Sequence, residues 1–370
     1  YIYRRHIVKI TVNQNELQSA INMTLKGVSN KNTIEILKGI LFETYEGKLM
    51  LTSNNLEIGV QTVIDADIQR EGKVVIDAKI ISDIVRKLPS SDVCLDVDET
   101  HIVKISSTSL EFNIKGFSGE DFPIPVSIEE NYYKEISSDI FKEMVRKTSF
   151  AVSLDETKPL LMGELIEFKN NSINMVAIDG FRLAIKYIKD DNFVTDSKII
   201  VPGKTLVDIS RMIPPSVDKI KLGFDEKHAS FIIGETILTT RLLEGEFINY
   251  SQIIPKEFST KLKIHTKDFL YALDRACLVA KNNLIKIDIS DDNLKISSKN
   301  DEIGNLEENI FIELEGSNLE IAFNAKYFMD ALKTIDEEYI SLELNTNVSP
   351  CILKPYDDDS YTYLLLPVRI

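Results

Sequence analysis

Hydrophobic and polar positions along this chain follow two periods, which alternate in the same order three times. Apolar side chains spaced three and four residues apart predict an amphipathic helix near the start of each unit. These predicted helices span residues 15–28, 138–150 and 266–280. Elsewhere apolar and polar residues alternate, as at Val93, Leu95 and Val97, and this pattern predicts half-buried strands. The sequence therefore predicts one arrangement of helices and strands used three times.

A second predicted helix in each unit contains the most regular repeat in the sequence. A fourteen-residue pattern begins at residues 76, 201 and 323 and ends at residues 89, 214 and 336. Its fourth position is always Lys, its eighth is always Asp and its eleventh is always basic. The residues are Lys79, Lys204 and Lys326; Asp83, Asp208 and Asp330; and Arg86, Arg211 and Lys333. A period this long is too large for a solenoid repeat, so each copy is expected to form its own core.

Together these elements predict an α+β fold of three tandem domains, each with two helices over antiparallel sheet. Pro-bearing segments recur at matching points and place the predicted domains at 7–128, 129–254 and 255–370. The chain has 370 residues, of which 44% are apolar and 27% charged, as is typical of globular proteins. Because no signal peptide and no apolar run of membrane-spanning length is apparent, we expect a cytoplasmic protein with no membrane partner.

Cysteine spacing and net charge limit the kinds of site and partner that the sequence allows. Cys94, Cys277 and Cys351 fall in different units without metal or redox spacing, so we expect core thiols in a reducing compartment. The formal net charge of −15 argues, taken alone, against a nucleic-acid partner. Net charge describes the whole surface, however, and an acidic exterior can coexist with a basic stripe.

The basic residues gather on the predicted helices. Positions four and eleven of the repeat are seven residues apart, which places both on one helix face. In one interpretation, Lys and Asp four residues apart form ordinary intrahelical ion pairs that need no ligand. Repetition favours another, in which three domains line one surface that holds a phosphate backbone without reading bases. On this basis the candidate DNA contacts are Lys79, Arg86, Lys142, Arg146, Lys204, Arg211, Lys326 and Lys333.

The chain resembles the bacterial DNA polymerase sliding clamps, the β subunit of the replicative polymerase. The resemblance covers residues 7–370 and rests on the threefold plan together with several motifs. These are TIEILKGIL at 33–41, LTSNNLEI at 51–58, DETKPLLMG at 155–163, VAIDGFRLA at 176–184 and LLLPVRI at 364–370. It implies a head-to-tail homodimer that closes into a ring around duplex DNA and confers processivity on a polymerase. It also implies that Lys31, Lys79 and Lys204 contact the duplex, and that the protein is bacterial, cytoplasmic and nucleoid-associated.

The resemblance implies a second site, a hydrophobic groove between the second and third domains that captures linear peptides. The implied partners are the replicative polymerase catalytic subunit, the clamp loader, repair polymerases and mismatch-repair proteins. The matching positions are Leu161, Gly180, Phe181, Arg182, Leu183, Ile248, Ile253, Asn324, Tyr327, Val348, Pro350, Leu364, Leu366, Pro367, Val368 and Arg369. Ile178 and Phe181 stand where the family usually has Thr and His, so we expect a more apolar groove. An ordinary core strand is the alternative for the C-terminal run.

Dimer contacts are expected, by position, between Phe112 and Ile114 of one copy and Leu278 and Val279 of another; ordinary core positions are the alternative. Two other functions are considered: a three-domain peptide-binding scaffold that never touches DNA, and a hydrolase using Asp179 and Arg182. The sequence has no P-loop, nucleophile elbow or metal-ligand spacing, so we predict no catalytic residue, no metal and no cofactor.

Overall fold

The structure is a computed structural model that describes residues 6–28, 34–129, 132–169, 171–189 and 196–369. It divides into two compact units, and each has its own sheets and core. The first unit contains residues 1–138 and 208–242, and the second contains residues 139–207 and 243–370. The strands pair in antiparallel fashion, as the alternating pattern predicts.

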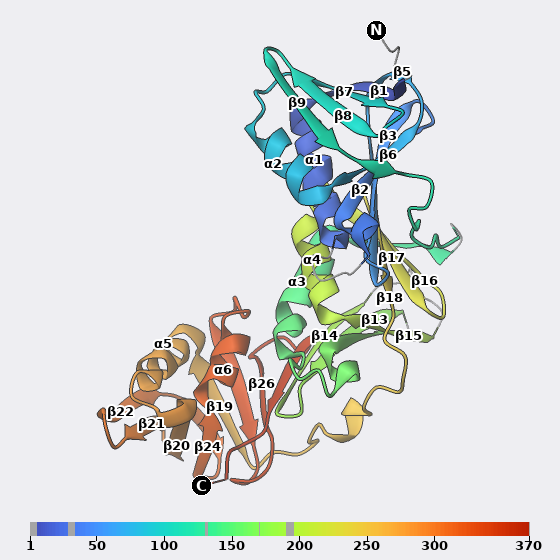
Figure 1. Cartoon of the computed structure of the whole chain (residues 1–370). Coiled ribbons are helices and arrows are strands. Elements are labelled where there is room, and N and C mark those ends of the chain that lie inside the picture. Colours follow the sequence, from blue (N-terminus) through green and yellow to red (C-terminus); the bar gives the residue numbers. More distant parts are fainter. Residues whose placement is uncertain (1–5, 29–33, 130–131, 170, 190–195, 370) are drawn as a thin grey trace. The chain divides into compact units, whose positions relative to one another are not determined.

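The N-terminal domain opens with a strand and a helix and adds a second helix halfway along. Its helices and strands are β1 (His6–Asn13), α1 (Gln14–Thr24), β2 (Gly39–Tyr45), β3 (Lys48–Asn54), β4 (Ile58–Ile64), β5 (Asp67–Arg70), β6 (Lys73–Asp77), α2 (Ala78–Lys87), β7 (Asp92–Asp98), β8 (Ile102–Ser107), β9 (Leu110–Lys115) and β10 (Phe117–Ser118). One sheet has the order β5-β1-β7-β8-β9. Helices α1 and α2 lie side by side, and Leu17 and Ile81 are buried among strand residues in the core (Figure 1).

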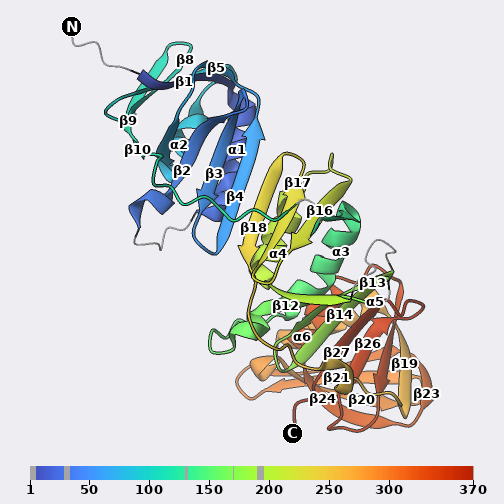
Figure 2. The ribbon, with the colours of Figure 1, turned by 90° about the vertical axis from the view of Figure 1, so that its right-hand side faces the viewer.

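A second sheet of the first unit extends beyond the N-terminal domain. It takes in β11 (Lys134–Ser137), β16 (Lys219–Phe224), β17 (His228–Ile233) and β18 (Thr236–Arg241). The order is β10-β6-β2-β3-β4-β18-β17-β16-β11, so the seam between early and late strands lies at β4 and β18 (Figure 2). The hydroxyls of Thr62 and Thr236 lie 2.8 Å apart at this seam and are buried. One hydroxyl donates and the other accepts, so each buried hydroxyl has a hydrogen-bond partner.

The second unit holds the rest of the central domain and the C-terminal domain. The central elements are α3 (Ser138–Thr148), β12 (Gly163–Phe168), β13 (Ser172–Ile178), β14 (Arg182–Lys189), β15 (Ser197–Pro202) and α4 (Gly203–Met212), of which α4 crosses the division between the units. The C-terminal elements are β19 (Thr260–His265), α5 (Thr266–Cys277), β20 (Leu284–Ser290), β21 (Asn293–Asn300), β22 (Gly304–Phe311), β23 (Glu313–Gly316), β24 (Leu319–Asn324), α6 (Ala325–Leu332), β25 (Tyr339–Leu344), β26 (Cys351–Pro355) and β27 (Tyr361–Leu365).

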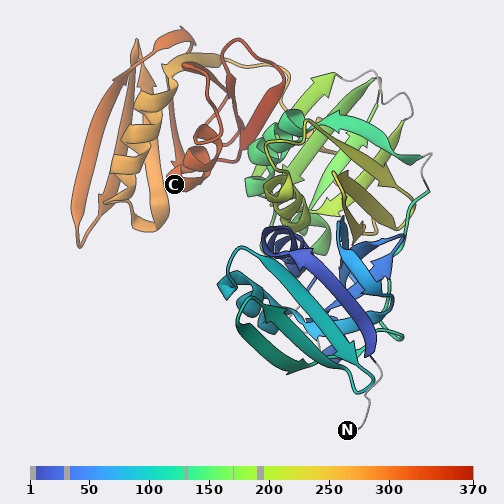
Figure 3. The same cartoon turned by 90° about the horizontal axis from the view of Figure 1, so that it is seen from above.

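One sheet of the second unit runs through both of its parts. Its order is β15-β12-β13-β14-β27-β26-β25-β19-β23, and β14 pairs with β27 in the register Arg182 to Leu365. A smaller sheet has the order β22-β21-β20-β24. Figure 3 shows the C-terminal domain, coloured orange and red, with its helices lying beside its strands. Aromatic side chains join the helices to each other and to the sheet: Phe328 of α6 packs edge-on against Phe269 of α5 and Phe323 of β24, with ring centroids 5.4 and 4.9 Å away.

The predicted helices exist, but their bounds differ. The predicted helix 15–28 begins one residue earlier and ends at Thr24, followed by a 3₁₀ turn. The helices predicted at 138–150 and 266–280 end at Thr148 and Cys277. In the fourteen-residue pattern, the first two positions finish strands β6, β15 and β24, and the helix begins at the third position. Asp77 and Asn324 at the second position cap their helices by accepting hydrogen bonds from the amides of Ile80 and Lys326.

Candidate functional site

The repeated helices carry the predicted lysines at the protein surface. Lys79 on α2, Lys204 on α4 and Lys326 on α6 are all exposed. The alternative in which each lysine pairs with the aspartate four residues later is wrong in all three copies. Within the described part of the chain, none of the three lysines forms an ion pair. Their ammonium groups are therefore available to an external anion.

The aspartates of the pattern bind other cations. Asp83 lies 2.6 Å from the guanidinium of Arg86, three residues later on the same helix. Asp208 accepts a hydrogen bond from Lys26 at 2.9 Å, and Asp330 accepts one from Arg182 at 2.6 Å. These partners come from tertiary packing in two copies out of three. In each copy the aspartate is therefore paired with another cation of the protein, and the lysine forms no ion pair among the described residues.

The other predicted cations are not equivalent. Arg211 and Lys333 are exposed, whereas Lys142 is half-buried. Arg146 is exposed but makes a bidentate contact with Asp336, with N–O distances of 2.5 and 3.3 Å, and this hydrogen bond lowers the pKa of Asp336. Part of the charge of Arg146 is thereby neutralised. Lys31 lies outside the described residues.

A tight turn between β13 and β14 begins the predicted groove. Gly180 has φ of +96°, a conformation that side chains other than glycine rarely adopt. The carboxylate of Asp179 accepts hydrogen bonds from the amides of Phe181 at 2.9 Å and Arg182 at 3.1 Å. This local hydrogen bonding holds the turn and projects the Phe181 side chain, which is 58% exposed.

Arg182 follows the turn and is held by the protein itself. Its Nε donates to Asp179 at 2.9 Å, Nη1 to Asp330 at 2.6 Å, and Nη2 to the carbonyl oxygen of Phe150 at 2.7 Å. The guanidinium carbon lies 4.6 Å from the ring centroid of Tyr327, a cation–π contact. Only 10% of the side chain is exposed. Arg182 therefore braces the groove wall, and its pairing with Asp179 gives no support to the hydrolase alternative.

An apolar cluster forms the floor of the predicted groove. Its buried members are Leu165, Val176, Ile178, Leu183, Ile185, Ile200, Phe247, Ile352 and Leu364, and Leu160, Leu161, Leu243, Tyr250, Ile253, Ile254 and Phe258 pack against them. Four predicted groove positions, Leu161, Leu183, Ile253 and Leu364, are thus in one cluster. Ile178 and Phe181, the two positions that differ from the pattern of the resembled family, are both packed against apolar neighbours. Ile178 is 6% exposed within the cluster, and Phe181 stacks on Tyr327 with ring centroids 6.2 Å apart.

The C-terminal segment, which carries predicted groove positions, runs beside strand β24 and the turn at Phe181. The amide of Leu366 donates to the carbonyl of Phe181 at 2.9 Å, and the amide of Val368 donates to the carbonyl of Ala322 at 2.8 Å. The side chains of Leu366 and Val368 are each 38% exposed, unlike those of a core strand. Ile248 and Val348 are 42% and 58% exposed, Pro350 and Pro367 are half-buried, and Arg369 is exposed. Exposed apolar side chains above a buried apolar floor suit an apolar ligand.

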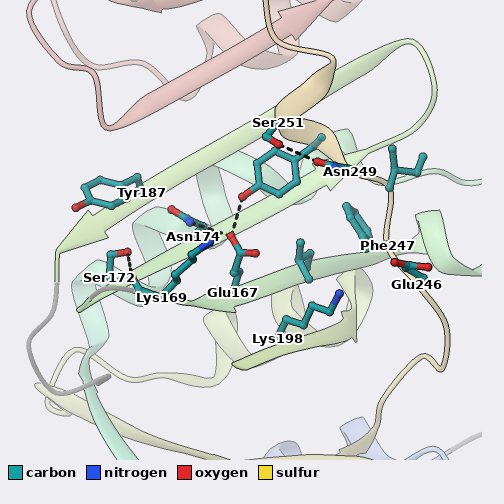
Figure 4. A pocket seen from close by; sticks show the side chains of 13 residues that line it. Glu167, Lys169, Ser172, Asn174, Tyr187, Lys198, Glu246, Phe247, Asn249 and Ser251 are labelled. Carbon is teal, nitrogen blue, oxygen red and sulfur yellow. Dashed lines mark hydrogen bonds between the residues drawn. The ribbon is translucent and has the colours of Figure 1, made fainter. Parts of the chain in front are cut away.

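A polar cleft of about 660 Å³ adjoins the floor on one sheet face (Figure 4). Strand residues Glu167, Asn174 and Lys198 form one side, and the segment from Glu246 to Ser251 forms another. Tyr250 donates a hydrogen bond to Glu167 at 2.9 Å. The sequence reasoning missed this pair, and it also missed Phe150 and Asp330 beside Arg182.

The predicted interface residues lie on sheet edges or beside them. Strand β9, with Phe112 and Ile114, is an edge strand of the first unit; Phe112 is 37% exposed and Ile114 is half-buried. Leu278 follows α5 and is 76% exposed, while Val279 is half-buried. Edge strand β22 ends in Phe311, also 76% exposed, which the sequence reasoning missed. The alternative of ordinary core positions is wrong for Phe112 and Leu278.

One carboxyl is buried without a cation. Glu164 on β12 is 0% exposed, and burial raises its pKa to about 7. Its oxygens contact the hydroxyls of Thr148, at 2.6 Å, and Ser149. Thr148 ends α3, and Ser149 begins the 3₁₀ turn that contains Phe150, whose carbonyl accepts a hydrogen bond from Arg182.

The cysteines and the other potential metal ligands of the described residues form no candidate site. Cys351 is buried, which raises the pKa of its thiol, but Cys94 and Cys277 are half-buried, so the core-thiol prediction holds fully only for Cys351. In the described ranges, no three His, Cys, Asp or Glu side chains are grouped so that they could hold a metal ion. No helix among the described residues has the length and apolar character needed to cross a membrane.

Three family models match consecutive parts of the chain. They are the N-terminal domain of the DNA polymerase III beta subunit over residues 8–126, its central domain over residues 135–249, and its C-terminal domain over residues 251–369. Together they account for the threefold plan.

Individual relatives agree over the full length. The beta sliding clamps of Staphylococcus epidermidis RP62A and Staphylococcus aureus N315 are each 32% identical, and each alignment covers 98% of this chain and 100% of the relative. The solved DNA polymerase sliding clamp of Bacillus subtilis is 30% identical, with a TM-score of 0.96 over 99% of this chain and 100% of that one.

Proposed function

This chain belongs to the DNA polymerase III beta subunit family, the bacterial sliding clamps. From this premise we propose which of its surfaces bind DNA, partner peptides and a second copy of the chain. Its role is that of a DNA sliding clamp in polymerase processivity, and the family is non-catalytic. We propose that two copies join head to tail into a closed ring around duplex DNA. The ring tethers partners through peptides bound in the groove described above.

The exposed, unpaired lysines at the fourth position of the repeat carry this proposal. Lys79, Lys204 and Lys326 occupy the same place in three domains, and their neighbouring aspartates pair elsewhere. Screened contacts between single lysines and phosphates are weak and read no bases. Encirclement needs no stronger contact, because the topology retains the DNA. The net charge of −15 is then compatible with a DNA partner.

Retention on DNA tests encirclement. After loading onto a nicked circular duplex, the protein is expected to remain bound through gel filtration and to be released when the circle is linearised. Equal retention on circular and linear DNA would refute encirclement. Charge reversal at Lys79, Lys204 and Lys326 is expected to lower polymerase processivity, whereas reversal of Lys169, Lys198 and Lys221, which are exposed outside the repeated helices, is the matched control.

The groove is proposed to bind linear peptides from the replicative polymerase, the clamp loader, repair polymerases and mismatch-repair proteins. Its apolar floor and its five exposed apolar side chains support one or two aliphatic or aromatic anchors; the side chains belong to Phe181, Ile248, Val348, Leu366 and Val368. A labelled peptide with such anchors is expected to bind in fluorescence anisotropy and to lose affinity when Leu366 is replaced by Asp. Unchanged affinity in that variant would place the peptide elsewhere.

Self-association is proposed to use exposed sheet edges. Phe112 and Ile114 on β9 are proposed to meet Leu278, Val279 and edge strand β22 of the second copy, because unpaired edges bearing apolar side chains favour strand addition. Replacing Leu278 by Asp is expected to shift sedimentation from dimer to monomer. We further propose the domain bounds 7–128, 129–254 and 255–370, a cytoplasmic, nucleoid-associated location and the absence of enzymatic activity.

A further inference from the structure

The segment that links the central strands to the C-terminal domain carries two groove residues, Ile248 and Ile253. It leaves the sheet after the amide of Leu243 donates to the carbonyl of Ile200 at 2.9 Å. It is fixed again at Ser259, whose amide donates to the side chain of Asn345 at 2.8 Å. Apolar packing of Phe247, Ile253 and neighbouring residues holds the segment between these points. Such packing has no strict direction, so it does not by itself set the register of the segment on the sheet.

Tyr250 lies between the two groove residues and makes a directional contact with the sheet. Its hydroxyl donates to Oε2 of Glu167 on β12 at 2.9 Å, and Nδ2 of Asn174 on β13 donates to the same oxygen at 3.2 Å. Burial, and then the contact with Glu167, raises the pKa of Tyr250, which keeps the hydroxyl protonated as a donor. Among the described residues from 245 to 256, no other side chain makes a hydrogen bond to the sheet. In Figure 4 Glu167 and Asn174 lie together on the strands, and Asn249 and Ser251 mark the segment that carries Tyr250.

We propose that the hydrogen bond from Tyr250 to Glu167 is a clasp that holds Ile248 and Ile253 in position for peptide binding. Tyr250 and Glu167 are then positioning residues of the groove, and Asn174 orients the accepting carboxylate. The inference rests on the proposed peptide-binding function of the groove. A 3₁₀ turn at Tyr250–Gln252 transmits the constraint, because the amide of Ile253 donates to the carbonyl of Tyr250 at 3.1 Å. When the clasp opens, the binding-competent fraction falls and the apparent Kd rises in proportion.

The test measures the affinity of a fluorescein-labelled peptide whose anchors are two leucines and a phenylalanine. Tyr250→Phe and Glu167→Ala are each expected to weaken binding about threefold to tenfold, the range for losing one hydrogen bond. Glu167→Gln is expected to retain affinity near that of the unchanged protein, because the amide oxygen still accepts from both donors. Tyr187→Phe is the matched control: Tyr187 lines the same cleft, and its hydroxyl has no hydrogen-bond partner among the described residues.

Two further readouts separate positioning from loss of fold. The double variant Tyr250→Phe with Glu167→Ala is expected to bind no more weakly than either single variant. Hydrogen exchange at the amides of residues 248–254 is expected to accelerate while the melting temperature stays within a few degrees. Full affinity in Tyr250→Phe, or additive losses in the double variant, would overturn the clasp. If the unchanged protein fails to bind the peptide at all, the proposed function fails instead, so the two failures are distinguishable.

Discussion

Replacing Glu164 by Gln is expected to remove a pH-dependent part of the free energy of unfolding. The hydroxyl of Thr148 lies 2.6 Å from Oε2 of Glu164 and 2.8 Å from the carbonyl oxygen of Met144. The hydroxyl of Ser149 also donates to this carboxyl. Both hydroxyl donors favour the charged form and lower the pKa of Glu164, but its complete burial raises the pKa by more. The net direction, a raised pKa, is therefore set by burial.

The size of the effect follows from the pKa. A rise from the usual 4.5 to about 7 corresponds to about 3 kcal/mol, at about 1.4 kcal/mol per pKa unit. The folded state favours the neutral form, so this stabilisation is fully present below pH 4.5 and is lost as the pH rises through about 7. Gln at this position is neutral at every pH. Between pH 5 and pH 8, the unchanged protein is expected to lose about 2 to 3 kcal/mol of stability relative to Glu164→Gln.

Urea unfolding of both proteins at intervals from pH 5 to pH 8 measures this difference. The exposed Glu246 offers a matched control, because Glu246→Gln changes the same chemical group outside the core. Its stability difference from the unchanged protein is expected to stay constant with pH. A constant difference for Glu164→Gln as well would mean that Glu164 is charged in the folded protein throughout this range, and the reasoning from burial would be wrong.

Three further changes test other contacts. Gly180→Ala is expected to destabilise the protein by about 1 kcal/mol in urea unfolding, because φ is +96° and no heavy atom lies near the added Cβ, so only backbone strain acts. Arg182→Lys is expected to cost about 2 kcal/mol and several degrees in melting temperature, because a lysine cannot serve Asp179, Asp330 and the Phe150 carbonyl together. Arg146→Ala is expected to cost less than about 1 kcal/mol, and less still at high salt, because its pair with Asp336 is 44% and 74% exposed.

The sequence predicted the threefold plan well because amphipathic periods report directly on which faces are buried. Helix ends were less accurate, since the pattern at 76–89 continues unbroken from strand β6 into α2. The intrahelical alternative for Lys204 and Asp208 is wrong: Lys26, which is 182 residues from Asp208 in sequence, donates to that carboxylate. Local spacing contains no information about such partners.

The candidate groove residues likewise include apolar positions that the sequence indicated and polar contacts that it did not. Its apolar positions were predicted through the resemblance, and Leu161, Leu183, Ile253 and Leu364 pack in one cluster. The polar contacts that brace it were missed, because Arg182 meets Asp330 across 148 residues and Tyr250 meets Glu167 across 83. Neither pair has a local signature. Tertiary packing of helix α6 and of the 3₁₀ turn at Tyr250–Gln252 against the strands brings these side chains together.

The antiparallel pairing of β14 with β27 has a consequence for how this binding surface diverges among relatives. The two strands are neighbours in one sheet, and their alignment is set by main-chain pairing from Arg182 with Leu365 through Lys186 with Tyr361. Side chains can therefore be exchanged at the ends of these strands without moving the strands themselves. A point substitution at Phe181 can therefore alter the apolar surface at this turn while the two strands keep their register.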